Sequence, residues 1–440
     1  MKISALRSIS HFFAAVLVFS GIGHGETHRV GGAAPQFDEI VDAVAAAVDG
    51  DVIHVNSGTY ERFAVDDKDL QIVGLEGSVV VNGLVRVRNI SQAKSVRISG
   101  LEFRGLDDEA LFIYDNLGQV ILQDCTLLGR DAVADYDNCT TSALPAAAIE
   151  DSVQVTLVDC VIRGGDGARG IDDGYTHLFC FLVNGASALS IYDSNVAVFG
   201  GECVGGHGKD SVEAHFVVEG GDGGDGIFVG GGSNIWVAGA LVQGGSGSTG
   251  NYEGTFSYCG DGGQGGDAIE LGQGGGGSTV RELGNILVAG AGGDHGYYQG
   301  NDPYYGCYDG PDGLQIRAAS GNTVQSLTGS ARRIDTVALA SDEDTVQLMI
   351  EGEPGDQVSL ILSSRDAFIP RPRGVLLLAN LRLGSARPAG TIPASGVLNI
   401  RLPQYDLAAS ANRELGIQAS IVDSTGARHL TNVRWMTVID

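Results

Sequence analysis

A short strand-like pattern recurs between residues 96 and 291 and constrains the fold more than any other feature of the sequence. Apolar residues alternate along each copy, which closes on a glycine in Val96–Gly105 and Val120–Gly129. Further copies begin at Val155, Val196, Ile235 and, in shortened form, Ile286. Alternation with a period of two is typical of β-strands. The chain is therefore predicted to be built from repeats of short strands.

A second short strand precedes each copy, and its starts fall 38 to 45 residues apart. The variable length lies in a loop after the closing glycine, and residues 201–310 hold 36 of the 68 glycines. A β-propeller repeats every 40 to 45 residues but needs four strands in each blade. The first two copies start only 24 residues apart, at Val96 and Val120. That spacing favours a parallel β-helix, in which one corner of the coil accepts loops of any length.

The N-terminal segment agrees with this fold and carries a family resemblance. Phe37, Ile40, Val41, Val44 and Val48 fall on one face of a predicted helix that would cap the first coil. The run FDEIVDAVAAAVDGDVIHVNSGTY, followed by LQIVGLEG, resembles the N-terminus of the pectin-lyase-like superfamily. The resemblance covers roughly residues 30–330. It implies a right-handed parallel β-helix, in a superfamily that holds polysaccharide lyases and hydrolases as well as non-catalytic surface proteins.

The two ends of the chain differ from this repeat. Residues 1–25 have the form of a signal peptide, with Lys2 and Arg7 before a short apolar run, and an N-terminal membrane anchor is the alternative. No later stretch is long enough to span a membrane. We expect residues 26–335 to form the β-helix and residues 336–440, where glycine is sparse, to form a β-sandwich. The protein is thus expected to be exported and secreted or held at the cell surface.

Net charge narrows the classes of partner. The chain has 54 acidic and 27 basic residues, which gives a formal charge of −27. A protein this acidic lacks the basic surface that nucleic-acid binding requires. We expect a polysaccharide or cell-surface glycan as partner, and no organic cofactor. The alternative function is that of a non-catalytic structural or adhesive surface protein.

A glycine and aspartate pattern indicates a possible calcium site. Gly220–Phe228 and Gly262–Glu270 both match the nonapeptide of calcium-binding β-rolls, although the two copies are 42 residues apart. Asp225 and Asp267 take equivalent places in them, and Asp312 is expected one coil later. Carboxylate oxygens suit calcium. The alternative is that aspartate and glycine serve left-handed turns, with aspartate capping backbone amides.

The family resemblance supplies candidate catalytic residues. Polygalacturonases use several aspartates and a Gly-His-Gly motif, and this chain has Asp172, Asp173 and a Gly-His-Gly centred on His207. It lacks their Asn-Thr-Asp and Arg-Ile-Lys motifs. Pectate lyases use aspartate-bound calcium with an Arg or Lys base, for which Arg169 and Lys209 are candidates. Neither basic residue lies in a recognisable motif.

Aromatic residues and cysteines complete the set of candidates. Tyrosines cluster in the long loops, and a tryptophan on an outward strand position joins them as a candidate for stacking on sugar rings; the candidates are Trp236, Tyr297, Tyr298, Tyr304 and Tyr305. The alternative is that these rings pack the loops together.

The mature chain has seven cysteines. Two pairs lie in loops of neighbouring coils and are predicted disulfides: Cys139–Cys180 and Cys259–Cys307.

Overall fold

The computed structural model describes most of the chain from residue 25 onward. The residues outside the description are 1–24, 76, 136–137, 169–183, 211–218, 251–258, 273–275, 297–306, 338, 342–344, 364–365, 379–385, 403–412 and 440. The predicted signal peptide therefore lies outside the described residues, apart from Gly25. Among the described residues, no helix is long and apolar enough to cross a membrane.

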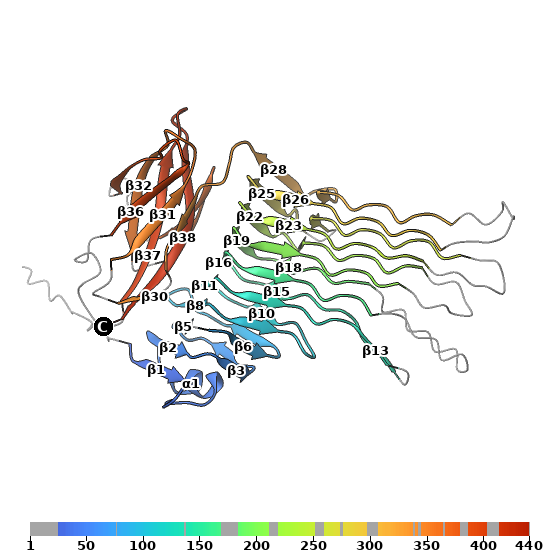
Figure 1. The fold of residues 1–440 in the computed structure, drawn as a ribbon, viewed down its shortest axis with the longest axis horizontal. Helices are drawn as coiled ribbons and strands as arrows, with labels where there is room; N and C mark the ends of the chain where they lie inside the picture. The colour runs from blue at the N-terminus through green and yellow to red at the C-terminus, as the bar shows by residue number, and fades with distance from the viewer. Residues whose placement is uncertain are drawn as a thin grey trace, which may run out of the picture.

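Three long parallel sheets wind into a parallel β-helix, as the strand repeat predicts (Figure 1). Sheet A has ten strands: β1 (Thr27–Val30), β2 (Asp51–Val55), β5 (Leu70–Gly74), β8 (Ser95–Ser99), β11 (Gln119–Gln123), β16 (Val155–Val158), β19 (Asn195–Phe199), β22 (Asn234–Ala238), β25 (Thr279–Leu283) and β28 (Thr323–Leu327). Sheet B has eight: β3 (Gly58–Glu61), β6 (Val79–Asn82), β9 (Glu102–Arg104), β12 (Thr126–Leu128), β17 (Val161–Arg163), β20 (Glu202–Val204), β23 (Leu241–Gln243) and β26 (Ile286–Val288). Sheet C also has eight: β4 (Ala64–Asp66), β7 (Val85–Arg88), β10 (Leu111–Tyr114), β15 (Ala147–Glu150), β18 (Leu189–Tyr192), β21 (Ile227–Gly230), β24 (Ile269–Leu271) and β27 (Ile316–Ala318).

The core of the β-helix is a set of apolar columns that run along the coil axis. Val120 pairs with Val96 on one side and with Val155 on the other, so the sequence copies superimpose coil on coil. These side chains are fully buried in one continuous cluster that extends from Val30 to Val280. Because the side chains in a strand alternate between faces, the intervening residues point outward and are free to form surfaces.

Left-handed residues form two corners of each coil. Strands of sheet A end in residues with positive φ, among them Gly100, Asp124, Asp159 and Gly200. Strands of sheet C end in a second series: Asp67, Asn89, Asp115, Asp151, Asp193 and Gly231. Glycine, asparagine and aspartate are the residues that adopt this conformation most readily. The third corner, between sheets B and C, is the one that opens into the long loops.

Helix α1 (Ile40–Ala46) lies against β1, β2, β3 and β4 and caps the first coil, as predicted. Its Ile40, Ala43 and Val44 are buried in the β-helix core. The predicted apolar face is wrong in part, because Val41 and Val48 are exposed. The helix ends at Ala46, so Val48 lies beyond it and does not follow the helical period.

The glycine-rich loops form two layers of straight segments, which we call the glycine legs. Outgoing legs (residues 205–210, 244–250 and 290–296) leave sheet B, and return legs (219–226, 259–268 and 308–315) lead back to sheet C (Figure 1). Every third amide in a leg repeats the same bond. Gly244 donates to Val288, the last residue of β26, and Gly247 and Gly250 donate to Ala291 and Asp294 of the next outgoing leg. Three residues per turn is the period of a polyproline II helix.

The close approach of the two layers of legs explains why glycine occupies so many positions in them. Gly245 of an outgoing leg donates its N–H to the Gly224 carbonyl of a return leg, and Gly266 donates to the Gly245 carbonyl. A Cβ atom at Gly245 would lie 1.9 Å from the Gly206 oxygen, which no side chain tolerates. None of the glycines in the described legs has a positive φ. Glycine is therefore required here for backbone packing, and the left-handed-turn alternative is wrong for these positions.

Aspartates supply further acceptors in the legs. Asp225 Oδ1 accepts the Asp267 N–H at 2.8 Å, and Asp222 Oδ1 accepts the Gln264 N–H at 2.7 Å. Asp210 and Asp261 do the same for Thr249 and Tyr308. In each case an aspartate side chain on one coil caps a backbone amide on the next. Amide capping by aspartate is what the alternative to a calcium site predicts. Backbone and side-chain acceptors together thus join the legs of successive coils without a regular strand.

A C-terminal region of mainly antiparallel strands follows the β-helix. A three-stranded sheet contains β29 (Arg333–Asp335), β31 (Gln347–Glu351) and β36 (Val397–Arg401). A five-stranded sheet contains β30 (Leu339–Ser341), β38 (Arg428–Ile439), β37 (Arg413–Val422), β32 (Gln357–Ser363) and β35 (Arg387–Thr391). All described strand pairs of these two sheets are antiparallel except β30 with β38. Residues of both sheets share one apolar cluster that includes Leu348 and Ile417. A hairpin of β33 (Asp366–Arg371) and β34 (Gly374–Leu378) completes the region, and a second hairpin, β13 (Val133–Asp135) and β14 (Asn138–Thr141), belongs to the loops.

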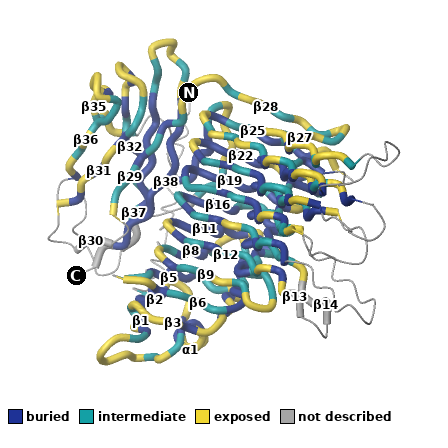
Figure 2. The backbone as a smooth tube through the Cα atoms, turned by 45° about the vertical axis from the view of Figure 1, so that its right-hand side comes forward, coloured by how far each residue is buried: buried dark blue, intermediate teal, exposed yellow. Residues whose placement is uncertain are grey.

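The C-terminal region is docked on the outer face of sheet A (Figure 2). Ile121, Phe199 and Trp236 of sheet A form one apolar cluster with Leu430 and Trp435 of β38. Beside it, the buried Arg434 guanidinium forms ion pairs of 2.8 Å with Asp124 and Asp159. Those aspartates occupy the left-handed corner described above, so the corner geometry also positions the docking contacts.

Replacing Gly245 with alanine tests the packing of the glycine legs. The added methyl group collides with the Gly206 carbonyl, and we expect the free energy of unfolding to fall by about 2 kcal/mol or more, as in overpacked cores. Chemical denaturation followed by circular dichroism measures the change. Ser246→Ala is the matched control, since that neighbour already carries a Cβ atom. Equal stability of Gly245→Ala and wild type would contradict the close packing of the legs.

Candidate functional site

A groove lies on the outer face of sheet B, where the outgoing segments leave the coil. It has a volume of about 750 Å³ and extends from β9 to β23, across five successive strands. Its floor holds outward side chains of the strands, among them Arg104, Arg163, Glu202 and Gln243. Asp131, Asp166 and His207, at the start of the outgoing segments, form its edge. At about 4.8 Å per strand, the groove is roughly 19 Å long.

Ion pairs on the groove floor are open to solvent. Arg163 lies 2.6 Å from Glu202, and Arg104 lies 2.6 Å from Glu102. Exposed pairs of this kind contribute about 0 to 1 kcal/mol. A ligand with hydroxyl or carboxylate groups can therefore replace one partner with little loss of protein stability. Leu128, between the two pairs, and Leu241, on the far side of Glu202, add apolar side chains to the lining of the groove.

His207 and Lys209, two of the predicted catalytic residues, meet at Asp166. Lys209 forms an ion pair of 2.8 Å with Asp166, whose other oxygen accepts the His207 backbone N–H. The His207 Nδ1 accepts the Ser246 N–H at 3.0 Å. Burial alone would raise the pKa of Asp166, but Lys209 and the His207 N–H outweigh it and lower the pKa. Asp166 is therefore ionised at neutral pH and unsuited to act as a general acid.

The other predicted catalytic residues, Arg169, Asp172 and Asp173, lie outside the described residues. So do Tyr297, Tyr298, Tyr304 and Tyr305. The functions proposed for them stay predictions. Sequence reasoning missed Asp166 and Arg163, which follow the inward Ile162 closely. The signal available was position alone: both come where a sheet B strand passes into its loop.

Trp236 is placed differently from the prediction. It points outward from the coil, as the alternation in β22 requires, but its side chain is only 5% exposed because the C-terminal region covers it. The prediction that Trp236 offers an open face to a sugar is therefore wrong. Outward alternation identifies the face of the sheet but not what packs on that face.

The predicted calcium residues are only partly brought together. Carboxylate oxygens of Asp225, Asp267 and Glu270 lie within 4.8 Å of one another. Glu270 was not among the predicted residues, although it follows the aspartate motif at an outward strand position. Asp312 is not part of this cluster. Ile269 pairs with Ile316, so the residue of the next coil that is equivalent to Asp267 is Leu314, two residues after Asp312. Asp312 instead accepts the Gly292 N–H at 2.8 Å.

The contacts of Asp267 do not fit a calcium ion. One carboxylate oxygen accepts the Leu314 N–H, and the carboxylate forms an ion pair with the Arg317 guanidinium. Calcium requires six to eight oxygen ligands. Here a guanidinium takes the place next to the carboxylates that a cation would need, and we derive no chemistry from calcium.

Asp225 responds to this crowding with a shifted pKa. Burial, together with the carboxylates of Glu270 and Asp267, raises its pKa to about 7, although the Asp267 N–H opposes the shift. The proton on Asp225 thus relieves the repulsion between buried carboxylates. This explains how the legs accommodate acidic side chains on successive coils.

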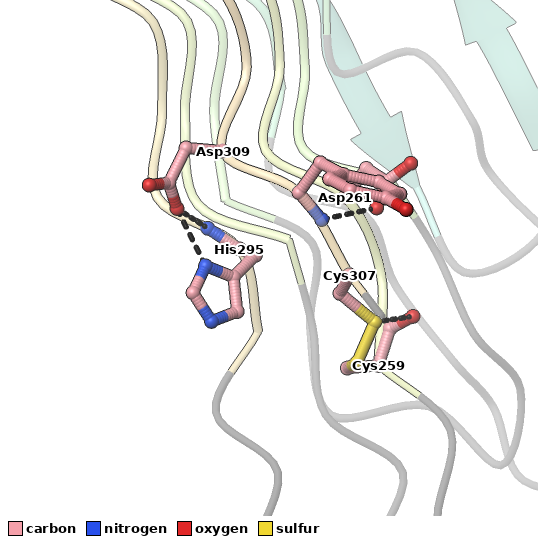
Figure 3. Close-up of a disulfide and its surroundings, with 6 residues drawn as sticks. Cys259, Asp261, His295, Cys307 and Asp309 are labelled. Carbon is pink, nitrogen blue, oxygen red and sulfur yellow. Dashed lines mark hydrogen bonds and ion pairs between the residues drawn. A yellow bond between two sulfur atoms is a disulfide. The ribbon is translucent and has the colours of Figure 1, made fainter. Parts of the chain in front are cut away.

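A disulfide fastens the outer ends of two return legs (Figure 3). Cys259 and Cys307, predicted as a pair, are bonded with their Cα atoms 6.0 Å apart. On the coil side of the disulfide, the Tyr308 N–H donates to Asp261. His295 donates its backbone N–H to Asp309 nearby (Figure 3). The second predicted pair cannot be compared in this way, because Cys180 lies outside the described residues. Cys125, Cys160 and Cys203 are buried free thiols.

Comparisons with known proteins leave the function to the geometry. No protein-family model matches the chain. No curated protein matches it either. Among solved structures, the chain has a weak likeness to ORF18 of Geobacillus virus E2, with 10% identity and a TM-score of 0.21 over 89% of this chain and 82% of the other. A likeness of that size carries no argument about fold or activity.

Replacing Asp225 with asparagine tests the shared proton. The pKa of Asp225 is higher in the folded protein than the usual value near 4 of an unfolded chain. Its contribution to stability is therefore full below about pH 4 and is lost as the pH rises through 7. We expect Asp225→Asn to be more stable than wild type at pH 8, by on the order of 1 kcal/mol, and to lose that advantage at pH 4.

Thermal unfolding at both pH values measures this difference. Asp222→Asn is the control, since Asp222 caps the equivalent amide one turn farther out and is partly exposed. EDTA should leave the melting temperature of the wild type unchanged. A variant less stable than wild type at pH 8, or a lowering by EDTA, would contradict this account of the cluster.

Proposed function

We propose that the protein is a secreted, non-catalytic polysaccharide-binding protein and that its ligand lies in the groove on sheet B. The groove itself carries this proposal. It runs perpendicular to five strands and presents polar side chains at intervals set by the coil. A linear polymer of repeated sugar units matches a surface that repeats in the same direction. Solvent-exposed arginines and a glutamine offer hydrogen bonds to sugar hydroxyls.

Contacts around the groove favour binding over cleavage. Glycoside hydrolysis needs one carboxylic acid with a raised pKa and a second carboxylate. In the described groove, Asp131 accepts the Asp166 N–H, Asp166 bonds Lys209, and Glu202 bonds Arg163. Each of these carboxylates is already held by a partner within the protein. The resemblance to pectin-lyase-like proteins supports a polysaccharide ligand, and the predicted signal peptide and the disulfide support export.

Arg163→Ala tests the proposal. Isothermal titration against soluble plant and bacterial polysaccharides identifies a ligand for the wild type. We expect the variant to bind about tenfold more weakly, the loss of one hydrogen bond from a charged group. Arg281→Ala, which removes an arginine bonded to Gln325 on sheet A, should bind like wild type. Mixtures should contain neither new reducing ends nor unsaturated sugars.

Failure to bind any polysaccharide, or equal binding by Arg163→Ala, would contradict the groove as a binding site. New sugar ends would show a catalytic protein. Unchanged melting temperatures of both variants show that the comparison concerns binding and not folding.

A further inference from the structure

A second surface, on the outer face of sheet C, has a chemistry of its own. Strands β10, β15, β18, β21 and β24 lie side by side there (Figure 1). Their outward residues form two columns along the coil axis. One column contains Phe112, Ala148, Ser190, Phe228 and Glu270; the other contains Tyr114, Glu150, Tyr192 and Gly230. In the second column, aromatic and carboxylate side chains alternate from coil to coil.

Two of the aromatic rings pack over glycines of the next coil. A Cβ atom on Gly230 would approach the Tyr192 ring to 2.6 Å, and one on Gly272 would approach the Phe228 ring to 2.6 Å. Tyr192 and Phe228 thus each extend over a glycine of the next coil, where no side chain blocks the ring. The Tyr192 and Phe228 centroids are 5.5 Å apart, and Phe112 stacks on Tyr114 at 4.5 Å. Tyr192 is 40% exposed.

Arginines flank this face at its two ends: Arg88 of β7 donates to the Tyr114 hydroxyl at 3.0 Å, and Arg317 of β27 lies beside Glu270. Between these ends the charged side chains are acidic. The five strands contain no lysine or arginine, and both of their charged residues are glutamates, Glu150 and Glu270. Asp115, Asp151 and Asp193 follow three of the strands at the left-handed corner. Burial raises the pKa of Glu150, and the nearby Asp151, Glu109 and Asp115 raise it further. The carboxylates repel one another, so a cationic ligand would be favoured here.

We propose that this face binds a linear polysaccharide whose sugars carry protonated amino groups. The C–H face of a sugar ring packs on an exposed aromatic ring, and an ammonium group is attracted both to aromatic faces and to carboxylates. Tyr114 and Tyr192 are separated by two strand spacings, ~10 Å, with Glu150 between them. An amino-sugar polymer offers the same alternation of apolar face and positive charge. This surface shares no side chain with the groove on sheet B.

Two soluble oligosaccharides of equal length test the proposal directly. The glucosamine hexamer carries one amine on each sugar, and the N-acetylglucosamine hexamer has the same rings without charge. In mildly acidic buffer of low salt, we expect wild-type protein to bind the glucosamine hexamer at least tenfold more tightly, and added salt to weaken that binding. Equal affinity for the two hexamers, or no binding of the charged one, would overturn the proposal.

Matched variants locate the site. Tyr192→Ala and Glu150→Gln should each weaken binding of the glucosamine hexamer about tenfold or more. Glu150→Gln should not change binding of the neutral hexamer. Tyr308→Ala removes another exposed tyrosine, near the disulfide, and should bind like wild type. Equal weakening by Tyr308→Ala, or none by Tyr192→Ala, would place the site elsewhere and overturn the proposal.

The groove variant keeps this test separate from the proposed function. Arg163→Ala should bind the glucosamine hexamer like wild type, whether or not the groove holds a polysaccharide. If Arg163→Ala alone weakens its binding, the hexamer lies in the groove and the proposal for sheet C is overturned. Melting temperatures near that of wild type confirm that each variant is folded.

Discussion

Backbone hydrogen bonds between successive coils are the interaction on which the rest of this structure depends. In the three sheets they are the regular bonds of parallel strands. In the glycine legs such bonds recur at every third residue outward from the coil. One series of them runs across the legs and joins Gly206, Gly224, Gly245, Gly266 and Gly290. The legs require glycine for these bonds, but the bonds within the sheets need no particular side chain, so the outward positions of the strands are free to vary. The candidate binding surfaces are made of those positions.

The regular spacing of the coils determines how the outward side chains are arranged on each face. Side chains at equivalent positions repeat along the axis at the distance between strands, about 4.8 Å. The groove on sheet B uses that repeat for polar and charged groups, and sheet C uses it for rings and carboxylates. Both surfaces suit a ligand that also repeats along its length. The C-terminal region covers the outer face of sheet A, so that the two candidate surfaces lie on the remaining faces.

The sequence could predict the parts of the fold that have a visible period. Alternation in Val96–Gly105 and its copies indicated the strands and their pairing, and loop position indicated the Cys259–Cys307 bond. The glycine legs were not predicted as such, because their repeat of Gly-Gly-x, in residues 220–225 and 262–267, also matches the nonapeptide of calcium-binding β-rolls. Asp312 was misplaced because a shift of two residues leaves every side chain on the same face of a strand. Burial of Trp236 depends on a region more than 100 residues later in the chain, which no local pattern contains.

Amide hydrogen exchange at residue resolution tests the central claim most directly. If the legs are held by backbone bonds between coils, the amides of Gly245, Gly266 and Gly290 exchange as slowly as those of sheet A strands such as β19 and β22. Their protection should reach the free energy of global unfolding, although no regular strand contains them. Exchange of these three amides at the rate of an unfolded chain, while the sheets stay protected, would contradict the account.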